Sequence, residues 1–251
     1  MNKDIVLDVR GVSKTYETND GNNTIAIKNL DLIVRRNEMV AVMGRSGSGK
    51  STLINVITGI MEADQGQVYI DGENVFDLSG ERVASFRRKH VGIVFQNYNL
   101  IDSLTIDENI RVPLIIDGKQ DGIDEKVLHI AQIVGISSIL YKYPYEVSGG
   151  QQQRAGICRA LVNKSKIIFA DEPTGNLDAK SADQVMNCFE DACRENESSL
   201  LIVTHDAKVA SHCDRVIFLQ NGCVALEMEK KSKDIADFYN SILETQKEVL
   251  V

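Results

Sequence analysis

Residues 44–52 read Gly-Arg-Ser-Gly-Ser-Gly-Lys-Ser-Thr, a spacing that suits the binding of phosphate groups. Glycines allow a tight loop whose backbone N–H groups surround phosphate oxygens, while the lysine reaches the outer phosphates and the next hydroxyl binds Mg²⁺. An all-apolar run at 39–43 precedes the loop. Apolar residues at helical spacing follow it and predict a helix that ends near Gly59 and buries Leu53, Val56, Ile57 and Ile60. This context predicts a nucleoside triphosphate site that consists of Gly44, Arg45, Ser46, Gly47, Ser48, Gly49, Lys50 and Ser51.

Polar residues follow three other apolar runs of the same kind: Asp171 and Glu172 after 166–170, Gln96 after 91–95, and His205 after 199–204. Ligands of an open α/β sheet bind at the carboxyl ends of its strands, so these side chains are expected to converge on the phosphate site. Of the two adjacent carboxylates, one can support the metal and the other can polarise an attacking water, as phosphoryl transfer to water requires. The amide of Gln96 can coordinate the metal or orient that water.

The stretch Ser148-Gly149-Gly150-Gln151 has the composition of a helix start that binds an anion. Ser148 can cap the helix, and the two glycines expose backbone N–H groups. Since the loop at 44–51 already surrounds the phosphates of its own nucleotide, this second helix start has no ligand within the chain. We therefore expect it to close on the γ-phosphate held by another copy, so that a head-to-tail homodimer encloses two nucleotides.

The periodicity of apolar residues predicts an α/β protein. Segments at 5–10, 24–34 and 67–70 indicate antiparallel strands, and Asp71-Gly72 indicates a hairpin turn. The four all-apolar runs indicate a mainly parallel sheet that is buried on both faces. From 97 to 145 the pattern is mostly helical, which predicts an α-helical subdomain of about 97–160 inserted into the sheet domain.

The end of the chain, 229–251, is expected to form a polar linker followed by a helix. Its apolar residues follow helical spacing: Ile235, Phe238, Tyr239, Ile242 and Leu243. Such an amphipathic helix is expected to dock on its own domain, with a partner protein or a membrane surface as the alternatives.

The 251 residues carry a formal net charge of −8, which argues against a nucleic-acid partner. No apolar run approaches the ~18 residues that a membrane span needs. The first residues lack the apolar core of a signal peptide, so we expect a cytoplasmic protein that reaches the membrane only through a partner. The five cysteines form no CxxC pair, which favours reduced, structural thiols.

In combination, these motifs resemble those of the ATP-binding-cassette (ABC) ATPase family over roughly residues 5–228: the loop 44–52, Gln96, the stretch 147–154, the segment 167–178 and His205. The resemblance implies ATP and Mg²⁺ as cofactors, with Ser51, Gln96 and Asp171 at the metal and Thr52 as a further nucleotide contact. It implies that 148–151 is the signature loop, which acts on the nucleotide of the other copy.

Further roles are implied by the same resemblance. Glu172 is the general base, Lys50 and Gln96 take part in catalysis, and His205 is the switch histidine. The loop Gly175–Asp178 crosses the dimer interface, and the ring of Tyr16 stacks on adenine.

Within the family, the chain resembles a branch that includes ATPases of lipoprotein-release, macrolide-export and bacitracin-type peptide-resistance transporters. The implied partner is a membrane permease, with the ATPase peripheral on the cytoplasmic face of the membrane. Apolar residues after Gln96 are expected either to receive a short helix of that partner or to pack internally: Leu100, Ile101, Leu104 and Ile106. Arg45 and Val147 depart from the usual family residues, outside the atoms expected to touch phosphate.

Two other functions compete with a transporter subunit. A soluble ABC ATPase of DNA repair or translation is disfavoured, because no long coiled coil separates the phosphate loop from the signature and the chain carries one cassette. A non-transporting ATPase that drives a membrane signalling or cell-wall-regulating complex stays open. The motifs leave the transported substrate and the direction of transport undetermined.

Overall fold

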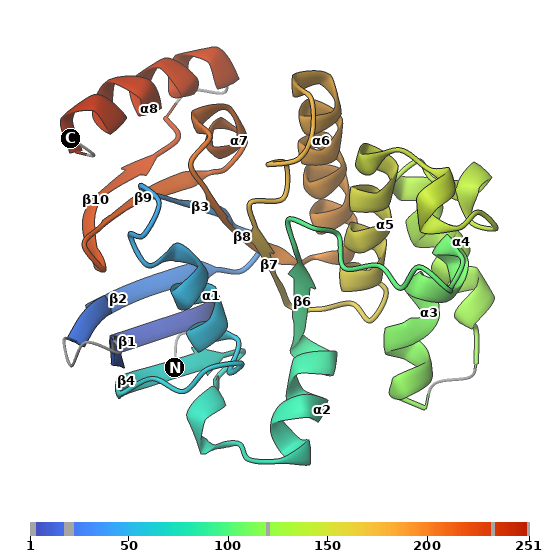
Figure 1. Cartoon of the computed structure of the whole chain (residues 1–251), viewed down its shortest axis with the longest axis horizontal. Helices are drawn as coiled ribbons and strands as arrows, with labels where there is room; N and C mark the ends of the chain where they lie inside the picture. The colour runs from blue at the N-terminus through green and yellow to red at the C-terminus, as the bar shows by residue number, and fades with distance from the viewer. Residues whose placement is uncertain (1–3, 18–22, 119–120, 232–233, 250–251) are drawn as a thin grey trace. The chain divides into compact units, whose positions relative to one another are not determined.

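The computed structural model describes residues 4–17, 23–118, 121–231 and 234–249. Internal contacts divide the chain into two compact units (Figure 1). Unit 1 comprises Met1–Val83 together with Ser199–Val251, and unit 2 comprises Ala84–Ser198. The chain therefore leaves unit 1, forms unit 2 as one continuous segment and returns to unit 1.

One sheet of unit 1 is antiparallel, with the strand order β2-β1-β4-β5. Its strands are β1 (Ile5–Glu17), β2 (Asn23–Arg35), β4 (Gln65–Ile70) and β5 (Glu73–Asn74). The hairpin between β4 and β5 turns at Asp71 and Gly72, whose φ angles of 51° and 86° are those of a tight hairpin turn. The strands and the turn predicted in this region are confirmed, and β1 extends further than predicted, so that it includes Tyr16.

The other strands of unit 1 lie in the order β10-β9-β3-β8. They are β3 (Met39–Met43), β8 (Ser199–Thr204), β9 (Arg215–Gln220) and β10 (Cys223–Glu229). Strand β3 is parallel to both β8 and β9, and every residue of β3 and β8 is buried, as their apolar sequences predict. Because Met43 pairs with Thr204, the chain leaves β3 and β8 at the same edge.

The helices of unit 1 begin with α1 (Lys50–Ile57), which follows the phosphate loop. Leu53, Val56 and Ile57 are buried as predicted, but Ile60 is 50% exposed. The prediction for Ile60 is wrong because α1 ends at Ile57 and Gly59, with φ 68°, turns the chain out of helical register. A 3₁₀ turn, η1 (Val75–Asp77), and α7 (Ala207–Ser211) also lie in this unit, while α2 (Glu81–His90) crosses the division between the units.

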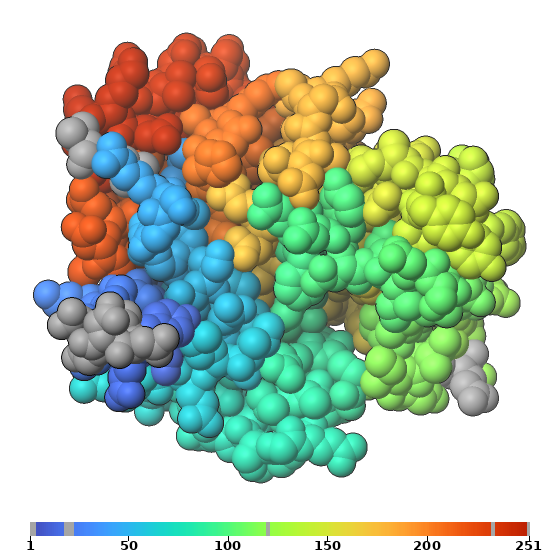
Figure 2. Space-filling model, in the orientation of Figure 1, coloured from blue at the N-terminus to red at the C-terminus, as the bar shows by residue number. Residues whose placement is uncertain are grey.

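The last helix, α8 (Ile235–Val249), packs on α7 and β9 of unit 1. Its residues Phe238 and Ile242 are buried, while Ile235 is exposed. Figure 2 shows α8 in red at the surface, beside the orange segments that carry α7 and β9. Docking of the amphipathic helix on its own chain is therefore confirmed.

Unit 2 contains a parallel pair of strands, β6 (Val91–Val94) and β7 (Ile167–Asp171). Its helices are α3 (Ile106–Ile116), α4 (Ile123–Ile133), α5 (Gly149–Leu161) and α6 (Ala179–Asn196), with 3₁₀ turns η2 (Ser137–Ile139) and η3 (Pro144–Glu146). Helix α5 packs against α3, α4, α6 and β6, so it is the central element of this unit. The predicted helical segment of about 97–160 contains α3, α4 and nearly all of α5, and the first of these helices begins at Ile106.

The four apolar residues singled out after Gln96 differ in how exposed they are in the structure. Ile106 is fully buried, which places it in the internal packing of unit 2 and removes it from the surface expected to receive a partner helix. Ile101 is 46% exposed, while Leu100 and Leu104 are half-buried. The reason is that α3 begins at Ile106 behind a capping box formed by Thr105, and its first residue faces the core.

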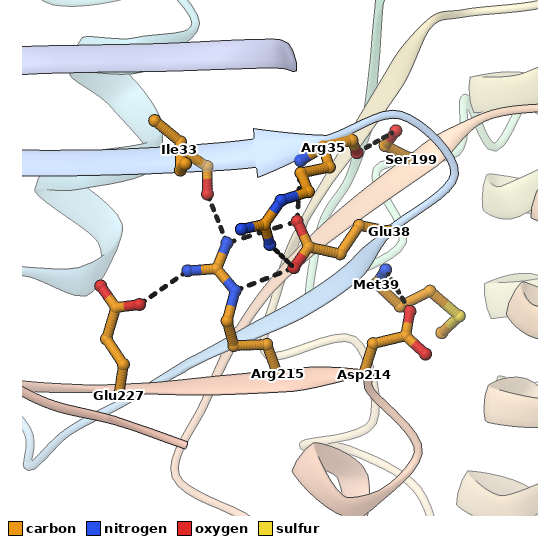
Figure 3. A network of polar contacts seen from close by, with 8 residues as sticks. All are labelled: Ile33, Arg35, Glu38, Met39, Ser199, Asp214, Arg215 and Glu227. Atoms are coloured by element: carbon orange, nitrogen blue, oxygen red, sulfur yellow. Dashed lines mark hydrogen bonds and ion pairs between the residues drawn. The ribbon is translucent and has the colours of Figure 1, made fainter. Parts of the chain in front are cut away.

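A buried ion-pair network joins the amino-terminal ends of β3 and β9 to β2 and β10 (Figure 3). The Arg215 side chain, 5% exposed, donates from Nε to Glu38 Oε1 at 2.8 Å and from Nη1 to Glu227 Oε2 at 2.8 Å. Its Nη2 donates to the carbonyl oxygen of Ile33 at 2.5 Å and to Glu38 Oε2 at 3.3 Å. Burial lowers the pKa of Arg215, but the hydrogen bonds and charges of the two glutamates outweigh it and raise this pKa overall.

Candidate functional site

The phosphate loop lies between β3 and α1 in unit 1. Gly47 and Gly49 have φ angles of 80° and 102°, in the left-handed region that L side chains disfavour. A Cβ atom on Gly49 would overlap the carbonyl oxygen of Ala26, and one on Gly44 would lie 2.6 Å from the carbonyl oxygen of Leu219. A Cβ on Gly47 would meet nothing within 4 Å. Close backbone packing thus requires glycine at 44 and 49. At 47, glycine is required only by the left-handed φ angle of the turn.

Two polar side chains are buried in this loop. The Nζ atom of Lys50 donates to the carbonyl oxygens of Gly44 at 2.8 Å and Arg45 at 3.0 Å. The hydroxyl of Ser48 is buried and has no hydrogen-bond partner among the residues that the structure describes. Leaving a buried hydroxyl unsatisfied costs about 1–3 kcal/mol, which a phosphate oxygen at this position would offset. A lysine and an unsatisfied hydroxyl in one glycine loop therefore fit a nucleoside phosphate.

The other loop residues are more accessible. Arg45, Ser46 and Ser51 are exposed, and Thr52 is half-buried in the first turn of α1. Ser51 is thus accessible to a metal ion that accompanies the phosphates, and its hydroxyl is an oxygen ligand of the kind that Mg²⁺ prefers.

Tyr16 lies beside the start of α1. Its hydroxyl is 3.2 Å from Thr52 Oγ1 and donates to Met61 Sδ at 3.2 Å. The side chain is anchored at its hydroxyl end, while the residue as a whole is 37% exposed. Stacking on the base of a nucleotide requires an aromatic ring at such a place, next to the phosphate loop.

His205 follows β8 directly. Because Thr204 pairs with Met43, His205 and Gly44 continue from the same edge of the unit 1 sheet. His205 is exposed, and the next residue, Asp206, caps α7 by accepting a hydrogen bond from Lys208 N at 2.8 Å. Unit 1 therefore brings the phosphate loop and His205 to one edge, with Tyr16 against the helix that follows the loop.

In unit 2, Gln96 and the two carboxylates follow paired strands. Val94 of β6 pairs with Ala170 of β7, so that Gln96, Asp171 and Glu172 continue from one edge of this parallel pair. Gln96 is exposed, and both carboxylates are half-buried. Glu172 has a φ angle of 44°, an unfavourable value for a residue with a Cβ, and strain of this kind is concentrated at functional sites.

The loop after Glu172 is held against the Gln96 segment. Asn176 Nδ2 donates to the carbonyl oxygen of Gln96 at 3.2 Å and to Asn97 Oδ1 at 3.1 Å. A Cβ on Gly175 would lie 2.8 Å from the Gln96 side-chain nitrogen, so the amide rests on this glycine. The predicted metal and catalytic residues of unit 2 are thus parts of one connected cluster.

The start of α5 has the predicted cap. Ser148 accepts a hydrogen bond from Gln151 N at 3.4 Å and its own N–H donates to Gln151 Oε1 at 3.0 Å, which completes a capping box. The N–H groups of Gly149 and Gly150 belong to the first turn, where helices offer no internal acceptor. This geometry provides the anion-binding helix start that the sequence predicts.

Asp178 caps α6 at the end of the same loop. Its Oδ1 accepts hydrogen bonds from Lys180 N and Ser181 N, each at 3.0 Å, and its Oδ2 accepts one from Ser181 Oγ at 2.7 Å. The hydroxyl of Ser181 and these N–H groups lower the pKa of Asp178. A Cβ on Gly150 would lie 3.4 Å from the Ser181 Cβ, so the starts of α5 and α6 are neighbours.

Two residues that contact this cluster were not predicted, Tyr98 and Arg159. Arg159 lies in α5 and contacts the chain 60 residues earlier, a pairing that no local pattern encodes. One signal was present in the sequence, because Arg159 is a charged residue within the otherwise uncharged run 155–162.

The part of the chain that the structure describes also bears on metal binding and on membrane insertion. It contains no group of three or more His, Cys, Asp or Glu side chains that could hold a metal ion. No helix within it is long and apolar enough to cross a membrane. The five cysteines are free, and burial raises the pKa of Cys193 to about 12, as expected for structural thiols.

Comparison with known proteins identifies the family of these motifs. The family model described as "ABC transporter" matches residues 27–175. The bacitracin export ATP-binding protein BceA of Halalkalibacterium halodurans is 40% identical over 242 residues, which cover 96% of this chain and 95% of that protein. The macrolide export ATP-binding/permease protein MacB of Escherichia coli is 41% identical over 218 residues, which cover 86% of this chain and 33% of MacB.

Among solved structures, the chain resembles the ATP-binding cassette MJ0796 in a dimeric post-hydrolysis state bound to ADP and Pi. The TM-score is 0.81 at 36% sequence identity, and the match covers 90% of this chain and 99% of that one. The antiparallel sheet, the mainly parallel sheet and the helical segment thus form an ABC ATPase fold.

Proposed function

The chain belongs to the ABC transporter family as an ATP-hydrolysing subunit, and on that premise we propose that two copies close head-to-tail around two ATP molecules to drive a membrane permease. The observation that supports this proposal is the presence in one chain of two structures whose geometry suits an anion. One is the glycine loop of unit 1 with Lys50 and Ser48, and the other is the capped start of α5 in unit 2. The ATP-binding cassette MJ0796, whose solved structure has a similar fold, forms a dimer.

In this proposal, unit 1 holds the nucleotide of its own chain. The Lys50 amino group exchanges the carbonyl oxygens of its own loop for the outer phosphates, Ser48 donates to a phosphate oxygen, and the ring of Tyr16 stacks on adenine. Mg²⁺, when bound, neutralises charge on the phosphates, with Ser51, Gln96 and Asp171 as the ligands that would hold it.

Hydrolysis is assigned to unit 2 together with His205. Glu172 accepts a proton from the attacking water, while Gln96 and His205 orient the water and the γ-phosphate. The start of α5, with Ser148, Gly149 and Gly150, stabilises the γ-phosphate held by the other copy. The loop that ends at Asp178 crosses to that copy.

The partner of the dimer is proposed to be a permease of the antimicrobial-peptide export type. Support comes from BceA, whose name assigns it to bacitracin export, and from MacB, which joins an ATP-binding part to a permease in one chain. A subunit of this kind lies on the cytoplasmic face of the membrane, held there by the permease.

The substitution Glu172→Gln tests the dimer. Hydrolysis should fall by at least about 10²-fold because the water loses its base, while ATP still binds. Gel filtration with saturating ATP and Mg²⁺ should then show a stable dimer. A protein with Glu172→Gln that stays monomeric under these conditions would contradict the proposal.

Two further variants locate the contacts that close the dimer. Adding Ser148→Arg to the Glu172→Gln protein should leave ATP binding to the monomer nearly unchanged and abolish the dimer, because bulk at the start of α5 obstructs the other copy. Lys50→Ala is the matched control, since it should weaken ATP binding itself by about tenfold or more. Loss of monomer binding in the Ser148→Arg protein would show that α5 acts on its own chain's nucleotide.

The permease is tested by co-purification from detergent-solubilised membranes, followed by a bacitracin transport assay in vesicles with the recovered complex. ATP-dependent movement of bacitracin is the expected result. ATP hydrolysis that the membrane protein stimulates without transport of the peptide would favour the signalling or cell-wall-regulating function instead.

A further inference from the structure

Two consecutive non-glycine residues after β6 have left-handed backbone angles. Tyr98 and Asn99 have φ angles of 61° and 48°. Such angles are unfavourable for residues with a Cβ, for tyrosine more than for asparagine, and they persist only where the surrounding structure holds them. A strained pair of this kind requires a group that stabilises it.

Arg159 of α5 is that group. Its Nη2 donates to the carbonyl oxygen of Tyr98 at 2.8 Å, and its Nη1 donates to that of Asn99 at 2.5 Å. Arg159 is half-buried and its pKa is lowered by burial, so the charge is kept there at a cost. The planar guanidinium presents two separate nitrogens in a fixed geometry to the two adjacent carbonyl oxygens, whereas a lysine would have one nitrogen on a flexible stem for both.

The left-handed turn directs the Tyr98 side chain to the start of α5. A Cβ on Gly149 would lie 2.6 Å from Tyr98 Oη and 3.3 Å from Leu177 Cδ2. Burial raises the pKa of the Tyr98 phenol, which agrees with an enclosed hydroxyl. Tyr98 and Leu177 therefore both pack on the first residue of the helix that is proposed to bind the other copy's phosphate.

The other end of the turn is bound to the predicted catalytic loop. Asn176, next to Leu177, donates to the carbonyl oxygen of Gln96 and to the side chain of Asn97. The segments 96–99, 148–150 and 172–178 thus contact one another within unit 2, and the turn at 98–99 lies between the Gln96 segment and α5.

We propose that Arg159 is a positioning residue, which keeps the turn at 98–99 left-handed and thereby couples the Gln96 segment to the start of α5. The proposal rests on the proposed function, in which these segments act on ATP. Arg159 acts only through the turn and through the ring of Tyr98 against Gly149. Without the guanidinium, the turn relaxes and the start of α5 no longer follows the Gln96 segment.

The test compares Arg159→Lys with a control that makes the same chemical change elsewhere in unit 2. Arg111→Lys is that control, because the Arg111 guanidinium likewise donates from several nitrogens to two residues, Asp107 and Asp124, and the hydrogen bonds found for it in the described structure reach none of the three segments. Arg159→Lys should lower kcat about tenfold and change the ATP affinity of the monomer less than about threefold. Arg111→Lys should leave kcat within about twofold of the original.

A second substitution separates positioning from a general effect on α5. Glycine adopts left-handed angles without the Cβ penalty, so adding Asn99→Gly to Arg159→Lys should restore kcat by about threefold. Unchanged kcat in Arg159→Lys, or a loss of kcat that Asn99→Gly does not restore, would overturn the proposal, since a merely structural arginine would gain nothing from glycine at 99.

Amide hydrogen exchange of the ATP-free monomer gives a readout that does not depend on dimer closure. Arg159→Lys should accelerate exchange together in 96–99 and 149–151 by about tenfold, and Arg111→Lys should not. If the Glu172→Gln protein never dimerises, the proposed function fails, and this exchange alone decides on the coupling. Faster amide exchange in 96–99 without faster exchange in 149–151 would overturn the proposed coupling.

Discussion

The two edges of the sheet that contains β3, β8 and β9 differ in how their polar groups are satisfied. At the amino-terminal edge, the buried guanidinium of Arg215 donates to Glu38, Glu227 and the carbonyl oxygen of Ile33 (Figure 3). At the carboxyl-terminal edge, the phosphate loop contains left-handed glycines and a buried Ser48 hydroxyl without a partner among the described residues.

This difference separates stability from function within one sheet. Groups whose hydrogen bonds are complete within the fold stabilise it and have no capacity left for a ligand. Groups that the fold leaves incomplete cost stability, and the ligand offsets that cost when it binds. The polar side chains of the nucleotide edge are therefore expected to respond to substitution through ATP affinity, and those of the opposite edge through stability.

The largest expected effect is that of Arg215→Ala. Removal of the guanidinium leaves Glu38 as a nearly buried charge without its main partner, and the free energy of unfolding should fall by about 3–5 kcal/mol. The ATP affinity of the folded protein should be unchanged, because the network lies at the edge away from the loop. Urea denaturation and calorimetric titration with ATP measure the two quantities.

Arg194→Ala is the control for that substitution. Arg194 pairs with Asp191 at an exposed position of α6, so its removal should change the stability by less than about 1 kcal/mol. Equal losses for the two variants would contradict a special role of the buried network.

An intermediate effect is expected within the phosphate loop. Gly49→Ala should lower the free energy of unfolding by about 2–3 kcal/mol, because the new Cβ combines a left-handed φ with overlap on the carbonyl oxygen of Ala26. Gly47→Ala should cost only about 1 kcal/mol, because its Cβ meets open space. Thermal denaturation of both proteins compares them, and equal costs would show that strain alone dictates these glycines.

The smallest effect is predicted for Ser48→Ala. Loss of the buried hydroxyl should weaken ATP binding by about tenfold while leaving the stability unchanged or raising it by up to about 1 kcal/mol. Ser46→Ala, at an exposed position of the same loop, should alter neither by a measurable amount. A stability loss in Ser48→Ala without weaker binding would place this hydroxyl with the groups that serve the fold.

Much of the fold was predictable because its signals are local. The run 39–43 is entirely apolar, which a strand buried on both faces requires, and the structure buries every residue of β3. Asp71-Gly72 forms the expected turn since few other residues tolerate two positive φ angles. The Ser148 cap followed likewise from residue types three positions apart.

What the patterns gave wrongly or left open has a different origin. Ile60 was assigned to the core from spacing, but a turn at Gly59 exposes it. For Ile106, both a partner contact and internal packing were open, and the register of α3 buries it. Helix ends and helix orientation depend on what packs against them, and a local pattern contains no information about that neighbour.

The sequence by itself determined the phosphate loop, the strand that precedes it and the capped start of α5, because each is a contiguous segment whose backbone geometry depends on its own residues. The left-handed turn at 98–99 was decided only by the tertiary structure. It depends on Arg159, 60 residues away, and on Gly149, which lets the ring of Tyr98 approach α5. Contacts of this kind exist only after packing has placed the segments together, because no periodicity or capping rule links residues so far apart in the chain.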